Sequence, residues 1–416
     1  MNRLRSLDVF RGMTVALMII VNNPGDWDAI YAPLEHATWH GCTPTDLVFP
    51  FFLFIVGVSV VFALSPSKND VSRHPEALKK VLIRALKLFS LGLFLNFYSR
   101  IDFGGAIPNF YPRLIICAVF TILMLGDWPQ KVQIWTLGIF LSLGFFLLFF
   151  EIGKFENARI PGVLQRISLV YLVVSWLFLK TSLRTQIYIF SSILLGYWAV
   201  MALLPVSGFG AANFNAGTNF ATWVDGLLGK HCYIATKTWD PEGILSTLPA
   251  ICTGLAGVFA GKWLKVKQPT NTMLLGLLLA GATLAIWGQV WDFFFPINKP
   301  LWTSSYVFFT AGLAAMLLAV FYWLIDVQKI PQGFYVFFLV YGVNAMTVFF
   351  GSGLIPRLLN DIKIGEKGSK QWLYENLILP HFADKINASL AAALTFALIW
   401  FVVLWIMWKK KVIIKV

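Results

Sequence analysis

Apolar runs long enough to cross a lipid bilayer recur along this chain from one end to the other. Hydrophobic residues make up 58% of the 416 positions and charged residues only 13%. A helix of about 20 apolar residues spans the hydrocarbon core, and a water-soluble domain could not shield so many such runs from solvent. Backbone groups in lipid must be hydrogen-bonded internally, and the sequence lacks the alternating pattern of barrel strands, so it predicts helices.

The apolar runs predict an all-α polytopic integral membrane protein with a bundle of about twelve transmembrane helices. The runs lie near 6–23, 44–64, 77–97, 112–126, 132–150, 161–180, 186–204, 243–263, 272–292, 303–325, 333–353 and 388–408. No change in composition marks a domain boundary. We therefore expect a single transmembrane domain over 1–416, with the polar segments 205–242 and 354–387 as external loops.

Basic residues in the connecting segments predict the orientation of the bundle. Cytoplasmic loops of membrane proteins are enriched in Lys and Arg. With the N-terminus inside, the inner segments, including Lys262, Lys265 and the run 409–411, hold most of the basic residues of a chain with net charge +13. We expect both termini in the cytoplasm, and we attribute the basic composition to topology, with no nucleic-acid partner.

Cysteine and histidine spacings give weak signals. Four cysteines are too few for a disulfide scaffold, and the sequence leaves open whether Cys42 and Cys232, both expected outside, lie close enough to pair. His36 and His40 are four residues apart, as zinc ligands on a helix can be, but no third ligand is evident. We predict no metal site.

The stretch EHATWHGCTPTDLVFPFFLF (35–54) places titratable groups at the outer end of a span. Thr43 and Pro44 are typical of a helix start, and Asp46 stands where a carboxylate can reach back to the cap, which explains Asp46 as well as a site role does. Pro50 cannot donate to the carbonyl of residue 46, which leaves an acceptor there. His36 is a natural proton acceptor or acyl carrier, or simply a solvated interfacial side chain.

Other polar residues fall at predicted outer helix ends. Asn22 ends the first span, where its amide could donate to a developing oxyanion or simply end the helix. The remaining members of this group are Arg166, Glu242, Asn298, Lys299, Trp302, Tyr341 and Asn344. Capping, packing or an interfacial aromatic explains each one singly, but together they predict polar groups converging on the outer half of the bundle.

Cations are stacked at a predicted inner helix end. In ALKKVLIRALKL, Lys80, Arg84 and Lys87 fall at positions i, i+4 and i+7, which share one helical face. With Asp8 and Arg11 of LDVFRGM they could line a basic pocket for a phosphorylated cytosolic ligand. An anionic lipid head group is an equally good ligand for these cations.

Five ordered motifs resemble the heparan-α-glucosaminide N-acetyltransferase family of transmembrane acyltransferases. They are LDVFRGM, EHATWHGCTPTDLVFPFFLFIVG, RIPGVLQRI, DPEGILST and INKPLWTSSY. The resemblance covers most of the chain, from about residue 6 to about residue 350. It implies an enzyme that takes an acetyl group from cytosolic acetyl-CoA to the amine of a terminal glucosamine across the membrane. The chain looks like a bacterial-type member, which implies an inner-membrane location with the active site facing the periplasm or exterior.

The resemblance assigns roles to candidate residues. His36 matches the family's active-site histidine, expected as general base or acetyl carrier, and Asn22 matches an asparagine at the end of the preceding helix. Asp46 is expected to orient the histidine or the sugar. The donor acetyl-CoA is expected at Arg11, Lys80, Arg84 and Lys87, and the acceptor at Arg166, Glu242, Trp302 and Asn344.

Two other functions fit the same pattern of helices and polar residues. A secondary transporter for a sugar or an anion would also have about twelve helices and a polar cluster within the bundle. An O-acetyltransferase of a cell-envelope glycan would use the same donor on a hydroxyl group. The expected partners are an amino-sugar or glycan acceptor and membrane lipid, and a homodimer is left open.

Overall fold

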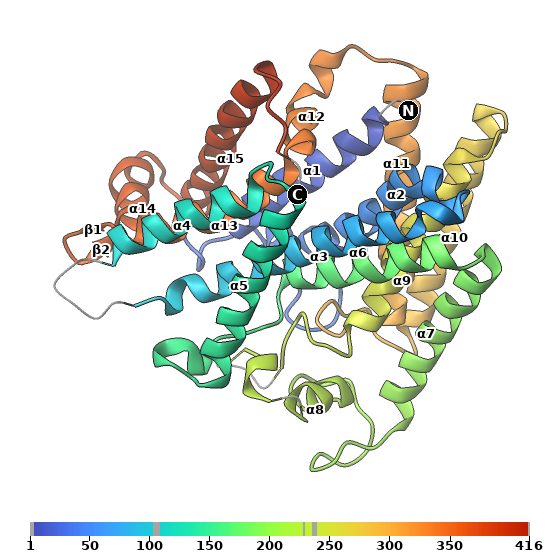
Figure 1. Cartoon of the computed structure of the whole chain (residues 1–416), viewed down its shortest axis with the longest axis horizontal. Helices are drawn as coiled ribbons and strands as arrows, with labels where there is room; N and C mark the ends of the chain where they lie inside the picture. Colours follow the sequence, from blue (N-terminus) through green and yellow to red (C-terminus); the bar gives the residue numbers. More distant parts are fainter. Residues whose placement is uncertain (1–3, 103–108, 228, 235–238, 415–416) are drawn as a thin grey trace.

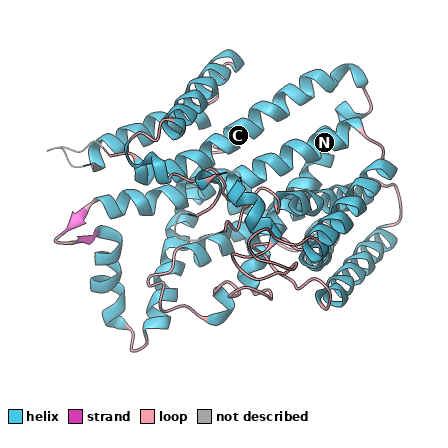
Figure 2. Cartoon of the chain, turned by 90° about the horizontal axis from the view of Figure 1, so that it is seen from below, coloured by secondary structure: helices cyan, strands magenta, loops and turns pink. Residues whose placement is uncertain are grey.

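The computed structural model describes residues 4–102, 109–227, 229–234 and 239–414, which form helices and their connecting loops (Figure 2). The helices of the first half are α1 (Arg5–Asn22), α2 (Val48–Lys68), α3 (His74–Phe97), α4 (Phe110–Leu125), α5 (Gln130–Phe149), α6 (Val163–Lys180), α7 (Leu183–Leu203) and α8 (Phe220–Leu227). Those of the second half are α9 (Thr247–Lys265), α10 (Thr270–Asp292), α11 (Ser304–Phe321), α12 (Val336–Val343), α13 (Ala345–Asp361), α14 (Ser369–Leu373) and α15 (Lys385–Lys409). The two-residue strands β1 (Lys363–Ile364) and β2 (Lys367–Gly368) pair antiparallel. The predicted all-α class is confirmed.

Nine helical stretches in the described part of the chain are long and apolar enough to cross a membrane. A tenth is reached if α12 and α13 are counted together. Two expected spans fall outside this count, because α1 carries Arg5, Asp8 and Arg11 within its 18 residues and α4 has only 16 residues. The number of about twelve spans and the cytoplasmic placement of both termini therefore stay predictions.

The prediction of one continuous span over 333–353 is wrong. α12 ends at Val343 and α13 begins at Ala345, with an angle of 81° between them. Asn344, at the break, has φ −117° and ψ 37°, outside the helical range. The apolar pattern runs through this point without a proline, so the break reflects a tertiary contact that local periodicity cannot show.

The helices that face the interior differ from those that face outward. Within the most apolar windows of α2, α3 and α6, 61% of residues are buried, and 67% in α9. The corresponding share is 17% in α5 and 22% in α7, α10 and α15. The first group therefore forms the centre of the bundle (Figure 1) and the second exposes apolar side chains on its outside. Figure 1 also shows α8 and its flanking loops at the bottom of the view, away from the N-terminus at the upper right.

Glycines allow two pairs of helices to touch backbone to backbone. A Cβ on Gly57 of α2 would lie 1.9 Å from the carbonyl oxygen of Gly254 in α9, and a Cβ on Gly342 of α12 would lie 1.8 Å from the carbonyl oxygen of Asp8 in α1. Small residues at such crossings let helices in a membrane approach closely and gain van der Waals contact. One crossing thus holds α2 against α9, and the other holds the start of α1 against the end of α12.

We predict that Gly342→Ala lowers the melting temperature of the purified protein by several degrees. The added methyl group must push α1 away from α12, and overpacking of this kind costs about 1–3 kcal/mol. Gly196→Ala in α7 is the matched control, because a Cβ there meets no atom within 4 Å. A Gly342→Ala protein that melts at the wild-type temperature would contradict the direct backbone contact.

Candidate active site

His36, Asp46 and Lys299 form a cluster at the start of the second span. His36 Nδ1 lies 2.7 Å from Asp46 Oδ1, and Lys299 Nζ lies 3.0 Å from His36 Nδ1 and 3.4 Å from Asp46 Oδ1. The side chain of Asp46 is 2% exposed and that of His36 is 53% exposed. A buried carboxylate therefore faces a half-exposed imidazole, with a cation beside both groups.

The backbone holds the Asp46 carboxylate in place. Its Oδ2 accepts hydrogen bonds from the amides of Ala37 at 3.0 Å and Thr43 at 3.1 Å, so the helix start predicted at Thr43 is confirmed. The carbonyl of Asp46, which Pro50 cannot serve, accepts a 2.5 Å hydrogen bond from the Tyr306 hydroxyl. The acceptor expected to be available is therefore occupied, and it ties α2 to α11.

Lys299 is the member of this cluster to which sequence reasoning assigned no specific role, although it belongs to the polar residues expected at the outer helix ends. It lies in the loop between α10 and α11, 263 positions from His36, and its side chain is 17% exposed. Burial lowers the pKa of Lys299, while the negative charges of Asp46 and Glu242 act in the opposite direction. The motif INKPLWTSSY drew attention to this loop, but no spacing in the sequence connects it to His36.

A cavity of about 440 Å³ lies at the ends of α1, α3, α6 and α13, and we call it the Glu242 cavity. Its polar lining side chains are Asn22, Asn23, Trp27, Asn96, Arg159, Gln165, Glu242, Ser352, Arg357, Asn360 and Lys370. Arg159 forms ion pairs with Asp240, at 2.6 Å, and with Glu242. Amides, carboxylates and an indole ring together suit a ligand rich in hydroxyl and amino groups.

A second cavity of about 440 Å³, the Arg84 cavity, contains two of the four predicted donor-site cations. Arg11 and Arg84 line it together with Tyr171, and the Arg84 guanidinium lies 5.3 Å from the Tyr171 ring centre. Arg11 pairs with Asp8 at 3.0 Å and donates to Ser59 at 2.9 Å. The cavity thus combines cations with an aromatic ring.

The structure does not bring the other two predicted donor-site cations, Lys80 and Lys87, to this cavity. Lys80 pairs with Glu76 at 2.6 Å on the exposed surface of α3. Lys87 is buried, and the negative charge of Asp127 acts on it. Within the described residues, neither lysine lines the Arg84 cavity. The three cations share one face of α3, but that face is exposed at Lys80 and buried at Lys87, so they do not line one cavity together.

The two cavities are stacked along the same helices. On α3, Leu88 lines the Arg84 cavity and Gly92 lines the Glu242 cavity, and on α6 Ile167 and Leu164 do the same. Separations of four and three residues correspond to roughly 5–6 Å of helix rise. α1 and α13 also contribute to both cavities. A partition about one helical turn thick therefore separates two polar cavities.

The predicted partners Asn22 and His36 are placed differently with respect to these cavities. Asn22 lines the Glu242 cavity at the end of α1. His36 is not among the described residues that line it. Lys299, which contacts His36, experiences the negative charge of Glu242, a residue of this cavity. Of the predicted acceptor residues, Glu242 is the one that lines this cavity.

Arg166 and Trp302 lie behind the cavity in the core. Arg166 Nη2 donates to the carbonyl of Gly243 at 2.9 Å and to Ser246 Oγ at 2.5 Å. Its guanidinium lies 5.1 Å from the ring centre of Trp302, whose Nε1 donates to Thr253 at 3.0 Å. Both side chains are fully buried, so the expectation that they line the acceptor site is corrected. They support the segment that carries Glu242.

Asn344 does not belong to the outer polar group. It is buried at the break between α12 and α13, and the residues that follow it, Ala345 and Met346, line the Arg84 cavity. The structure therefore places Asn344 beside the Arg84 cavity and not among the described residues that line the Glu242 cavity. The sequence left open whether Cys42 and Cys232 pair. In the described part of the chain both are free thiols, so they form no disulfide with each other.

Comparison with known proteins identifies the class to which these helices and cavities belong. The catalytic-region family model for heparan-alpha-glucosaminide N-acetyltransferase matches residues 3–300. The chain therefore belongs to the heparan-alpha-glucosaminide N-acetyltransferase family. The protein of that name from Homo sapiens is 27% identical and that from Mus musculus 26% identical over the whole of this chain. The chain spans about 60% of the length of these relatives.

Asp225 of α8 generates a prediction about pH. Burial raises the pKa of this carboxyl from 3.8 to about 6, and its Oδ1 accepts a hydrogen bond from the Ile244 amide at 2.9 Å. The folded protein thus binds this proton more tightly than the unfolded chain, so the free energy of unfolding falls as pH rises from about 4 to about 6. We expect Asp225→Asn to flatten this fall in thermal melts at pH 4.5–7. Asp28→Asn, at an exposed position, should leave it unchanged; equal slopes for both variants would contradict the prediction.

Proposed function

We propose that this protein is a transmembrane N-acetyltransferase that moves the acetyl group of cytosolic acetyl-CoA to the amine of a glucosamine-type sugar on the external side. The observation that carries the proposal is the stacking of the Arg84 and Glu242 cavities along the same helices, about one turn apart. The family and the names of its human and mouse relatives supply the reaction type. Turnover requires the partition to open far enough for the acetyl group to pass.

The Arg84 cavity suits the donor. A guanidinium grips phosphate oxygens through paired hydrogen bonds, and Arg84 and Arg11 provide two such groups at one cavity. Phe52, Leu88 and Met346 form apolar walls along which an extended arm can lie. Phe52 is six residues from Asp46 on the same helical segment, roughly 9 Å of helix rise. The donor's reactive end is thereby directed toward the Asp46 end of α2.

The Glu242 cavity suits the acceptor. The carboxylate of Glu242 can pair with the ammonium group of an amino sugar, and the Trp27 ring offers a face for the apolar side of a pyranose. Asn22 is proposed as a donor to the oxyanion, a role in which losing one hydrogen bond typically costs ~10²–10³ in rate. Arg166 holds the carbonyl of Gly243, next to Glu242, and so keeps that carboxylate in position.

His36 is proposed as the general base. We assign Nδ1–H as the donor to Asp46, so that Nε2, which lies 3.4 Å from Lys299 Nζ, carries the lone pair that accepts a proton. The bound ammonium group first releases one proton to solvent, and as the resulting amine nitrogen forms the amide bond, its second proton passes to Nε2. The thioester C–S bond breaks, and the departing sulfur takes up the proton as the thiol. If His36 is acetylated first, an acetyl-enzyme accumulates and the kinetics are ping-pong.

The location of the reaction follows from the same proposal. In this proposal residues 1–416 form one membrane domain. The Arg84 cavity lies on its cytoplasmic side and His36 on the opposite side. For a bacterial cell this means an inner-membrane enzyme whose acceptor site faces the periplasm. Lipid surrounds the exposed apolar faces of α4, α5, α7, α10 and α15.

His36→Ala should reduce acetyl transfer to glucosamine by about 10²–10⁴-fold, because the reaction loses its general base. The measurement uses purified protein, labelled acetyl-CoA and glucosamine, with His381→Ala, an exposed histidine after α14, as control. Turnover near the wild-type rate would dismiss the assignment. Mild alkali distinguishes the product bond, since an N-acetyl group survives it and an O-acetyl ester does not.

Arg84→Ala should weaken acetyl-CoA binding by about 10–100-fold, the loss expected for hydrogen bonds to a charged group. Lys80→Ala is the matched control on the same helix, because Lys80 pairs with Glu76 outside the cavity and should leave the affinity unchanged. Direct titration with acetyl-CoA gives both values. An unchanged affinity in Arg84→Ala would reassign the Arg84 cavity to a lipid head group.

A further inference from the structure

The C-terminal tail folds back from the end of α15. Lys411 adopts a φ of +56°, and the Val412 amide donates to the carbonyl of Met407 at 2.8 Å. This is the geometry of a left-handed helix cap, where glycine is the usual residue because a side chain is sterically disfavoured there. A lysine holds this conformation only if contacts further along the tail offset its cost.

Those contacts come from Asn344. Its Nδ2 donates to the carbonyl of Val412 at 3.1 Å, and its Oδ1 accepts from the amide of Ile414 at 3.0 Å. The Asn344 side chain is buried, so these two bonds satisfy an amide that would otherwise be costly to bury. The break between α12 and α13 and the path of the tail are therefore linked through one side chain.

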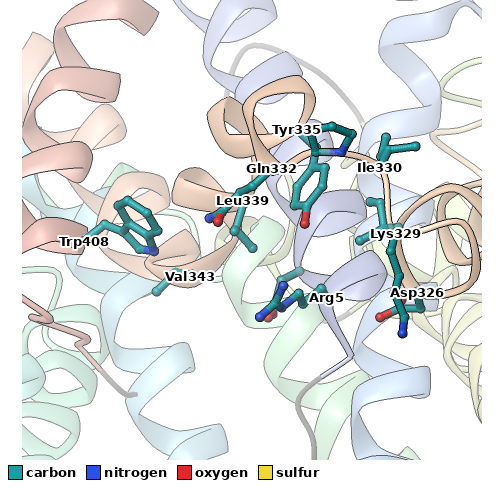
Figure 3. A pocket seen from close by; sticks show the side chains of 12 residues that line it. Arg5, Asp326, Lys329, Ile330, Gln332, Tyr335, Leu339, Val343 and Trp408 are labelled. Atoms are coloured by element: carbon teal, nitrogen blue, oxygen red, sulfur yellow. The ribbon is translucent and has the colours of Figure 1, made fainter.

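The pinned tail lies between two cavities. Ile413 and Ile414 line the Arg84 cavity. Trp408, just before the turn, lines a neighbouring cavity of about 940 Å³ that also contains Arg5, which we call the Arg5 cavity. Figure 3 shows Trp408 and Val343 at one side of the Arg5 cavity and Lys329 at the other. Val343 lines both cavities, so the end of α12 stands between them.

We propose that Asn344 is a positioning residue that pins residues 412–414 as a wall of the donor site, and that this wall sets the affinity for acyl-CoA without acting in the transfer step. Ile413 and Ile414 supply apolar surface to the ligand in the Arg84 cavity. The identity of the ligand rests on the proposed function. The placement of the tail is independent of that function, because it rests on the two hydrogen bonds of Asn344.

The first test needs no ligand. Ser59 lines the Arg84 cavity, so Ser59→Cys in a background with the four native cysteines replaced reports how accessible the cavity is to a thiol reagent. Asn344→Ala, or deletion of residues 412–416, should speed labelling at least tenfold. Asn376→Ala, whose amide bonds the Trp372 carbonyl on the exposed surface, is the control. Labelling at the parent rate in the deletion variant would overturn the proposal.

The second test separates binding from chemistry. Asn344→Ala should raise the KM for acetyl-CoA about tenfold, leaving kcat and the KM for the sugar unchanged. Asn344→Asp keeps the acceptor for the Ile414 amide and loses the donor to the Val412 carbonyl. Its KM for acetyl-CoA should therefore lie between those of the wild type and Asn344→Ala. A reduced kcat with unchanged KM would overturn the positioning role.

The two tests also separate this proposal from the proposed function. A wild-type protein that binds no acetyl-CoA refutes the proposed donor, whereas accelerated labelling would still show that the tail covers the cavity. Unchanged labelling in an enzyme that does transfer acetyl groups refutes the tail proposal and leaves the function standing. The same labelling measurement on Ile413→Ala extends the comparison to a variant that keeps Asn344. Ile399→Ala, at an exposed position on α15 away from the cavity lining, is its control.

Discussion

A carboxylate buried at the end of a membrane helix must be fully hydrogen-bonded, and Asp46 meets this requirement by joining separate segments of the chain. It accepts from the amides of Ala37 and Thr43, contacts the imidazole of His36 and lies 3.4 Å from the ammonium of Lys299. An unpaired charge there would be expensive, so each of these contacts is needed for the fold as well as for the site. The position of His36 is a consequence of satisfying Asp46.

The stacking of the two cavities follows from how the central helices pack. Backbone contacts at glycine bring α1 against α12 and α2 against α9, and the same central helices leave space at both ends of the bundle. A break in one helix, at Asn344, lets α13 contribute to both cavities and provides an anchor for the tail. Helix packing therefore accounts for two separate polar sites and for the thin partition between them.

Sequence reasoning was most successful where the signal is local. The apolar runs located all nine membrane-length helices of the described residues, and Thr43, Pro44 and Asp46 marked a helix start that the structure confirms. Its failures lie where distant segments meet. Lys80 and Lys87 share a helical face with Arg84, yet surface exposure and burial take them away from the cavity. Asn344 and Trp302 have roles set by the tail and by the buried Arg166, which no spacing encodes.

The sequence alone determined the class of the protein, because lipid tolerates few backbone structures and the length of an apolar run sets its span. It also singled out His36 and Asp46, whose side chains the structure brings into contact, because helix-start chemistry and the family motif both fall within one short stretch. Tertiary structure decided that Lys299 joins them, that two cations and not four line the Arg84 cavity, and that the tail reaches Asn344. Such contacts depend on the rotation and bending of packed helices, and those are set by side chains far apart in the chain.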